Sequence, residues 1–167
     1  KRFLVWMAHR MPRWVNSDHL TILGFAGMVF AGSSYWIASY NRFALLLVVV
    51  GLAVNWFGDS LDGTLARVRN RSRPRYGYYV DHVVDIFGAI SLLGGLALSS
   101  FMSPSVAVGL LLVYMLLNID IYLATHALGK FRLSYWKLGP TELRMALAMG
   151  TLVLLVRPEV HLAGQKF

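Results

Sequence analysis

Residues 59–85 read DSLDGTLARVRNRSRPRYGYYVDHVVD. This stretch holds four of the eight acidic residues of the 167-residue chain, and it joins two apolar segments through an arginine-rich loop. In its first half, residues at offsets 0, 3, 4, 7 and 8 share one face of an α-helix: Asp59, Asp62, Gly63, Ala66 and Arg67. In its second half, offsets 0, 4 and 8 do the same: Gly77, Asp81 and Asp85.

The composition around this stretch is that of a membrane protein. Hydrophobic residues make up 57% of the chain and charged residues only 14%, with a mean hydropathy of +0.56. So few charges exclude a small soluble domain and a disordered chain. The absence of cysteine excludes disulfides, thiolate metal sites and a cysteine nucleophile. A net charge of +8 favours contact with an anionic membrane surface over nucleic acid binding.

Five apolar segments are long enough to cross a bilayer as helices, which takes roughly 20 residues each. They cover approximately residues 19–39, 43–66, 77–100, 104–126 and 141–157. None alternates with a period of two, so we predict an all-α, polytopic helical membrane bundle. Residues 3–11 mix aromatic and basic side chains, which is typical of an amphipathic helix lying in the membrane interface.

The basic residues predict the orientation of this bundle. Thirteen of the 16 Lys and Arg residues fall on one side: Lys1, Arg2, Arg10 and Arg13 before the first span, Arg67, Arg69, Arg71, Arg73 and Arg75 after the second, and Lys130, Arg132, Lys137 and Arg144 after the fourth. Only Arg42, Arg157 and Lys166 fall on the other side. The positive-inside rule therefore places the N-terminus and both basic loops in the cytoplasm.

The short loop makes the second and third spans antiparallel neighbours, so the four aspartates of residues 59–85 can converge. Clustered carboxylates repel one another, and a divalent cation relieves that repulsion more completely than partial protonation. Oxygen ligands alone favour one or two Mg²⁺ or Mn²⁺ ions. Arg67 then offers a positive charge to a phosphate. Metal ions, an arginine and a free carboxylate are the groups that enzymes of phosphoryl transfer use.

The same residues carry a resemblance to a known family. They are similar to the signature of the class I CDP-alcohol phosphotransferases, D-x2-D-G-x2-A-R-x8-G-x3-D-x3-D, and every defining residue is present. One departure is that nine residues, not eight, separate Arg67 from Gly77. The extra residue falls in the loop and leaves both helical spacings intact, so we expect the site to be preserved.

The resemblance implies transfer of a phospho-alcohol group from a CDP-linked lipid or alcohol donor to a small-alcohol or lipid acceptor. The acceptor hydroxyl would make a metal-assisted, in-line attack on the β-phosphate, with release of CMP. It also implies a homodimer of six-helix chains, with the active site near the cytoplasmic face. Five spans are visible here, so we expect residues 1–167 to form a single domain that is incomplete at its C-terminus. The first residue is not Met, so we also expect the N-terminus to be incomplete.

By position in the family motif, Asp59, Asp62, Asp81 and Asp85 would bind the metal. Asp85 would also be the catalytic base that takes the acceptor's proton. The CDP portion of the donor would contact three residues in the first half of the motif, at the end of the second predicted span: Gly63, Ala66 and Arg67.

The substrates stay open at this point. The five-arginine loop favours a CDP-diacylglycerol-type donor, and hence phosphatidyl transfer in phospholipid biosynthesis. The alternative is a CDP-aminoalcohol phosphotransferase acting on diacylglycerol, because an Asp-His pair like Asp81-His82 occurs in that branch. Outside this class, a membrane cation transporter would also place acids within the bilayer, though spread through its depth.

Several polar residues have a functional and a structural reading. Four arginines of the loop either hold an anionic lipid or simply set the topology: Arg69, Arg71, Arg73 and Arg75. Asp120, close to Asn118 in the fourth span, either contacts the acceptor or braces the bundle. Glu142 and Arg144 open the fifth span, where the acid complements the helix N-terminus or the pair belongs to the pocket.

Overall fold

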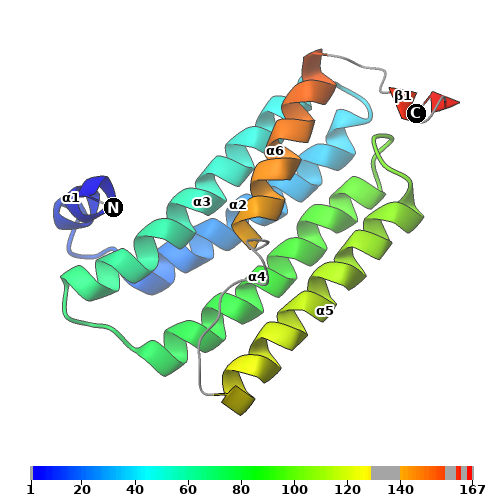
Figure 1. Ribbon diagram of the computed structural model, residues 1–167. Coiled ribbons are helices and arrows are strands. Elements are labelled where there is room, and N and C mark those ends of the chain that lie inside the picture. Colours follow the sequence, from blue (N-terminus) through cyan, green and yellow to red (C-terminus); the bar gives the residue numbers. More distant parts are fainter. Residues whose placement is uncertain (1, 129–139, 157–160, 163–164, 167) are drawn as a thin grey trace.

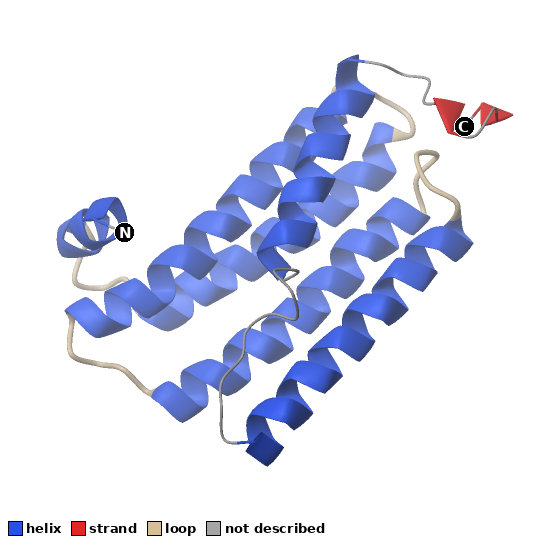
Figure 2. Ribbon diagram, viewed as in Figure 1, coloured by secondary structure: helices blue, strands red, loops and turns tan. Residues whose placement is uncertain are grey.

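The computed structural model of the protein describes residues 2–128, 140–156, 161–162 and 165–166 (Figure 1). Within them, helices dominate, and a two-residue antiparallel strand pair lies near the C-terminus (Figure 2). The elements are α1 (Arg2–Arg10), α2 (Ser17–Ala38), α3 (Ala44–Val68), α4 (Pro74–Ala97), α5 (Pro104–Leu128), α6 (Pro140–Val156), β1 (His161–Leu162) and β2 (Gln165–Lys166). The predicted all-α helical membrane bundle is confirmed.

Each predicted span coincides with one helix to within three residues at both ends. Four helices, α2 to α5, are long and apolar enough to cross a membrane. The fifth predicted span coincides with α6, and the part of this helix whose side chains are described, Arg144–Val156, is apolar. Helix α4 begins three residues earlier than predicted, since Pro74 takes a first-turn position where a proline ring costs no hydrogen bond.

Helix α2 is the centre of the bundle, with α3 packed on one side and α4 on the other (Figure 1). Glycines allow both contacts to be close. A Cβ atom at Gly27 would lie 2.7 Å from the carbonyl oxygen of Gly51 in α3, and one at Gly95 in α4 would overlap the backbone of Gly32. This packing sets the C-terminal half of α3 and the N-terminal half of α4 on the same end of α2.

The remaining helices pack around these three. Helix α5 lies along α4, and α6 lies along α3. Near its C-terminal end α6 is fixed by Arg42, whose guanidinium donates to the carbonyl oxygens of Leu154, at 2.8 Å, and Leu155. In its middle, the Thr151 hydroxyl bonds that of Tyr35 at 2.5 Å. These contacts place the N-terminal end of α6 beside the acidic ends of α3 and α4.

The N-terminal segment packs against the end of α3. Helix α1 buries Ala8 and leaves Phe3 and Trp6 exposed, as an interfacial amphipathic helix would. The turn that follows α1 is held by Arg69, which donates to the backbone carbonyls of Met11 at 3.0 Å and Pro12 at 2.8 Å, and to that of Val15.

Candidate active site

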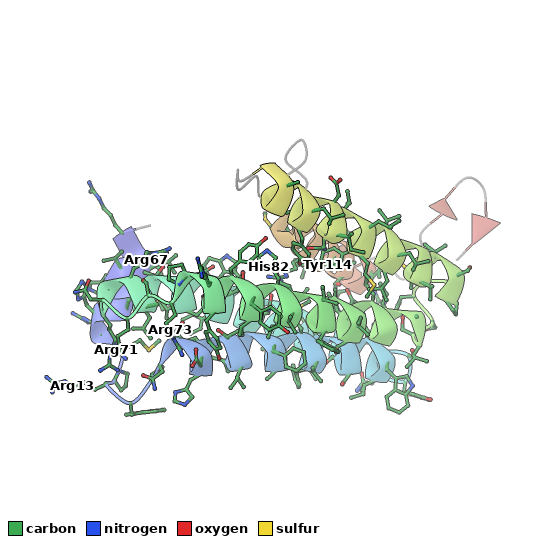
Figure 3. All side chains as sticks on the ribbon, turned by 90° about the horizontal axis from the view of Figure 1, so that it is seen from below. Arg13, Arg67, Arg71, Arg73, His82 and Tyr114 are labelled. Carbon is green, nitrogen blue, oxygen red and sulfur yellow. The ribbon has the colours of Figure 1, made fainter. Side chains whose placement is uncertain are left out.

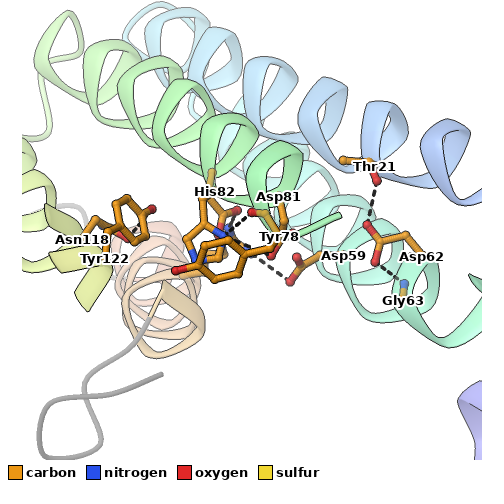
Figure 4. Close-up of polar contacts among 11 residues, drawn as sticks. Thr21, Asp59, Asp62, Gly63, Tyr78, Asp81, His82, Asn118 and Tyr122 are labelled. Atoms are coloured by element: carbon orange, nitrogen blue, oxygen red, sulfur yellow. Dashed lines mark hydrogen bonds and ion pairs between the residues drawn. The ribbon is translucent and has the colours of Figure 1, made fainter. Parts of the chain in front are cut away.

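The four aspartates of the signature surround one small cavity. Asp59 and Asp62 come from α3, and Asp81 and Asp85 come from α4; all four line it. Figure 4 shows the first three side by side across the two helices. The cavity measures about 10 Å³, roughly the room that one water molecule needs. The two acidic stripes line a common space, as predicted, but the second and third spans do not pack mainly on each other as expected, because α3 and α4 each pack against α2.

Asp62 is held in place by the start of α2. The Thr21 hydroxyl donates to Asp62 Oδ2 at 2.8 Å, and the backbone N–H of Gly63 donates to Oδ1 at 2.5 Å (Figure 4). The Ser17 hydroxyl donates to the Asp62 carbonyl oxygen at 3.1 Å. Every donor in this set is neutral, so it orients the carboxylate without cancelling its charge.

Arg144 of α6 supplies the positive charge that the aspartates need. Its guanidinium forms ion pairs with Asp59, Nη1 to Oδ2 at 3.3 Å, and with Asp85, Nη2 to Oδ1. The Arg144 side chain is only 10% exposed, so water has little access to its guanidinium group. The sequence left the role of this residue open. The available signal was a cation near the start of an apolar segment, which in a membrane helix usually has an acidic partner.

The donor atoms around the cavity are of the chemical type that a hard divalent cation prefers. Beside the four carboxylates, Asn55 also lines the cavity, and its buried amide oxygen has no hydrogen-bond partner among the described residues. Carboxylate and amide oxygens are the ligands that Mg²⁺ and Mn²⁺ prefer. Within residues 2–128 and the described part of α6, no three acidic, His or Cys side chains converge tightly enough to hold an ion. Arg144 holds two of the four carboxylates instead.

A larger cavity of about 520 Å³ adjoins the aspartates, and it is bounded by α2, α3, α4 and the loop between α3 and α4. Small residues of the signature line it, namely Gly63, Ala66 and Gly77. A Cβ atom at Gly63 would meet only the Arg67 guanidinium, at 3.9 Å, and one at Gly77 would have no atom within 4 Å. Helix packing therefore does not require these two glycines, whereas close approach of a ligand would.

The arginines of the loop differ in what they contact. Arg67 lines the large cavity, and among the described residues its guanidinium donates a hydrogen bond to the Thr64 hydroxyl alone, at 3.4 Å. Arg71 lines the same cavity. Figure 3 shows both at the end of the bundle that also carries Arg13 and Arg73. These two side chains are placed to meet an anion that enters the cavity.

The other three loop arginines are placed differently. Arg73 Nη2 donates to both carboxylate oxygens of Asp18, each at 2.8 Å; this ion pair raises the pKa of Arg73 and closes one edge of the cavity. Arg69 is committed to the backbone carbonyls after α1. Arg75 is exposed and lines none of the cavities found in the described part of the chain. Of the four arginines predicted to bind lipid or set the topology, Arg71 and Arg73 therefore border the large cavity, whereas Arg69 and Arg75 do not.

Two other polar residues singled out in the sequence, Asp120 and His82, line neither the acidic cavity nor the large one. Asp120 is exposed on α5 and does not line the cavities of the described residues, whereas Asn118 is buried and bonds the carbonyl oxygen of Tyr114 at 2.7 Å. His82 is half-buried, with its Nδ1 atom 2.6 Å from the Tyr78 carbonyl oxygen and 4.0 Å from Asp81 (Figure 4). The side chain of Glu142 lies outside the described residues, as do Lys130, Arg132 and Lys137.

Comparison of the sequence with known proteins assigns the chain to a family. A sequence model of the family described as CDP-alcohol phosphatidyltransferase matches residues 14–165. That range contains both acidic helices, the arginine loop and α6. No solved structure matches the chain significantly.

Two curated relatives match about half of the chain. Ceramide phosphoethanolamine synthase of Drosophila melanogaster is 34% identical over 91 residues, which is 51% of this chain and 21% of the relative. Archaetidylinositol phosphate synthase of Pyrococcus horikoshii is 31% identical over 84 residues, which is 50% of this chain and 42% of the relative. The matches thus span less than half the length of either relative.

Proposed function

The chain belongs to the CDP-alcohol phosphatidyltransferase family, and on that premise we propose that it transfers a phospho-alcohol group from a CDP-linked donor to an acceptor hydroxyl, releasing CMP. One observation carries the proposal. Four carboxylates from two helices line one small cavity, and an adjoining cavity of about 520 Å³ is lined by arginines and residues with little or no side chain. A cavity of that size is suited to a nucleotide headgroup.

The donor's CDP portion occupies the large cavity in this proposal. Gly63 and Gly77 leave open space there, which lets the pyrophosphate approach the backbone closely. Arg67 and Arg71 offer guanidinium groups to its oxygens, and bidentate hydrogen bonds suit that pairing. Ala66 adds a small side chain on the same face. The reacting phosphate then lies at the mouth of the acidic cavity.

The chemistry takes place beside the aspartates. Asp59, Asp62 and Asp81 would hold one or two Mg²⁺ or Mn²⁺ ions, with Asp85 as a fourth ligand. When bound, such an ion supplies positive charge that offsets the charge on the pyrophosphate and on the departing CMP. Asp85 accepts the proton of the acceptor hydroxyl while the new P–O bond forms at the β-phosphate. The P–O bond to CMP breaks, and CMP leaves with the α-phosphate.

We propose a phosphatidyl donor of the CDP-diacylglycerol type and a small alcohol as acceptor. Arg67 and Arg71, at the interfacial end of the bundle, support an anionic lipid donor. The alternative is a CDP-aminoalcohol donor with a diacylglycerol acceptor. One relative's name contains phosphoethanolamine and the other's contains inositol phosphate, so the relatives do not separate these two choices.

The setting of the site follows from the same residues. Helices α2 to α5 make this an integral membrane protein. Arg67, Arg71 and Arg73 lie at the same end of the bundle as Arg13, which precedes α2 (Figure 3). The positive-inside rule supports a cytoplasmic location for that end and for the N-terminus. Assembly as a homodimer stays a prediction from the family resemblance.

The experiment that tests the proposed function is a CMP-release assay on the purified chain in liposomes, over a panel of CDP-linked donors and alcohol acceptors with Mg²⁺ or Mn²⁺. We expect CMP release with at least one donor and acceptor pair, and release that depends on both substrates. Cation flux into the liposomes without CMP release from any pair would instead favour the transporter.

A pair of glycine variants separates ligand contact from packing. Gly63→Ala should weaken binding of the CDP donor about tenfold while leaving the melting temperature unchanged, because its new methyl group meets open space in the protein. Gly58→Ala is the matched control on the same helix, where a Cβ atom would lie 2.5 Å from the Leu20 carbonyl oxygen. We expect it to lower the melting temperature. Donor titration and thermal unfolding of both variants would measure this, and unaltered donor binding by Gly63→Ala would contradict it.

A second pair of variants separates the loop arginines. Arg67→Ala should raise the KM for the donor roughly tenfold or more, because it removes a charged hydrogen-bond donor from the cavity. Arg69→Ala should leave that KM nearly unchanged and lower the melting temperature, because Arg69 holds the turn after α1. Equal KM values for the two variants would contradict the assignment of donor contact to Arg67 and not to Arg69.

A further inference from the structure

The ion pairs of Arg144 involve the same carboxylates that the proposed metal site uses. Its guanidinium bonds Asp59 Oδ2 and Asp85 Oδ1, one carboxylate from each acidic helix. The two acidic side chains are 32% and 19% exposed, so the group is partly shielded from water. Asp62, by comparison, accepts hydrogen bonds from neutral donors alone within the described part of the chain. Arg144 is thus the positive partner of the site in the described residues.

A divalent ion and this guanidinium cannot use the same oxygen atoms in the same way. A carboxylate oxygen that accepts a hydrogen bond from an arginine N–H has part of its negative charge and one lone pair already engaged, so it binds a metal ion less strongly than a free oxygen does. The two cations also repel each other when both lie between α3 and α4. Binding of the ion and the ion pairs of Arg144 are therefore coupled, and each weakens the other.

We propose that Arg144 is an internal counter-ion, which a divalent ion must displace from Asp59 and Asp85 when it binds. The inference rests on the proposed metal site. Before metal binding, Arg144 limits the repulsion among the aspartates and so stabilises the protein. During binding Arg144 competes with the ion for Asp59 and Asp85. It therefore weakens the affinity for the ion, so a higher metal concentration is needed to fill the site.

The exchange has a structural consequence for α6. Near its C-terminal end this helix is fixed by Arg42, and at its middle by the Tyr35–Thr151 hydrogen bond. At its N-terminal end, the ion pairs of Arg144 connect it to α3 and α4. Displacing Arg144 removes the polar contacts that the described residues make at this end while the other contacts persist, so we expect metal binding to loosen the first turns of α6.

The test measures Mn²⁺ binding to the whole chain in nanodiscs by electron paramagnetic resonance, together with thermal unfolding with and without metal. We expect Arg144→Met to bind Mn²⁺ about tenfold more tightly than the wild type, within the usual range of coupling between sites. Its metal-free form should melt at a lower temperature and gain more from Mn²⁺. Arg42→Met is the matched control, because it removes an arginine that fixes the same helix through carbonyl oxygens. It should bind Mn²⁺ like the wild type.

The outcomes separate this inference from the proposed function. If the wild type shows no saturable Mn²⁺ binding, the proposed metal site fails and the inference fails with it. If the wild type binds Mn²⁺ and Arg144→Met binds it equally or less tightly, only the counter-ion role is overturned. Should Arg144→Met not fold, Arg144→Lys keeps the charge but loses the fork that spans both carboxylates. An intermediate affinity supports exchange of contacts, and an affinity equal to that of the wild type overturns it.

Hydrogen exchange adds a readout that simple charge repulsion would not change. In the wild type, Mn²⁺ should speed amide exchange in the first turns of α6. In Arg144→Met, exchange there should be fast with or without the ion. Slower exchange in wild-type α6 on adding Mn²⁺ would show that the ion tightens this helix, and would overturn the proposed release.

Discussion

Replacing Asp85 by Asn should abolish CMP release while binding of the CDP-linked donor persists. Asn has nearly the same shape and can still accept a hydrogen bond from Arg144, so the fold of α4 is kept. An amide cannot take a proton from the acceptor hydroxyl, and loss of a general base typically costs about 10²- to 10⁴-fold in rate. The decisive comparison is CMP release against donor affinity measured by calorimetric titration.

Asp120→Asn is the control for this experiment. It changes another acid in a membrane helix to an amide, but Asp120 is exposed on α5 and lines neither the acidic cavity nor the large one beside it. We expect its CMP release to be within about twofold of the wild type. Full activity of Asp85→Asn would remove Asp85 from the role of base.

The second large effect should come from removing divalent ions. A chelator is expected to lower CMP release by about 10³-fold or more, because the aspartates and the donor's pyrophosphate are all negative and repel one another without the ion. Addition of Mg²⁺ or Mn²⁺ in excess should restore the activity. The restoration should be complete, since Arg144 pairs with Asp59 and Asp85 when no metal is bound.

Thermal unfolding in the presence of chelator serves as the control for the loss of activity. The helices pack through apolar and glycine contacts that do not involve the site, so the metal-free protein should still unfold cooperatively. Release of CMP that is indifferent to chelators would contradict the metal-dependent chemistry. Irreversible inactivation with loss of cooperative unfolding would show that the ion is needed for folding.

The sequence was sufficient for the helices and for the acidic stripes because both depend on local spacing. A helix repeats every 3.6 residues, so Asp59 and Asp62 share a face wherever that helix lies, and so do Asp81 and Asp85. Apolar length alone placed the ends of each span within three residues. The short loop after α3 then brought the two stripes to the same end of the bundle.

Features that depend on distant parts of the chain were harder to predict. Arg144 is 59 and 85 residues away from its two partners, and only the packing of α6 along α3 brings it to them. The orientation of α5 was equally hidden. Two residues along a helix differ by about 200°, so burying Asn118 against the bundle turns Asp120 outward. The same rotation separates Arg69, which bonds carbonyl oxygens, from Arg67, which lines the cavity.

Equilibrium dialysis of Mn²⁺ against the purified chain tests most directly whether α3 and α4 build one ion site together. The measurement compares the wild type with Asp62→Asn from α3, Asp81→Asn from α4 and the control Asp120→Asn. We predict saturable binding of one or two ions in the wild type and in the control, and a large loss of affinity in both of the other variants. Undiminished binding after either substitution would show that the two helices do not share an ion.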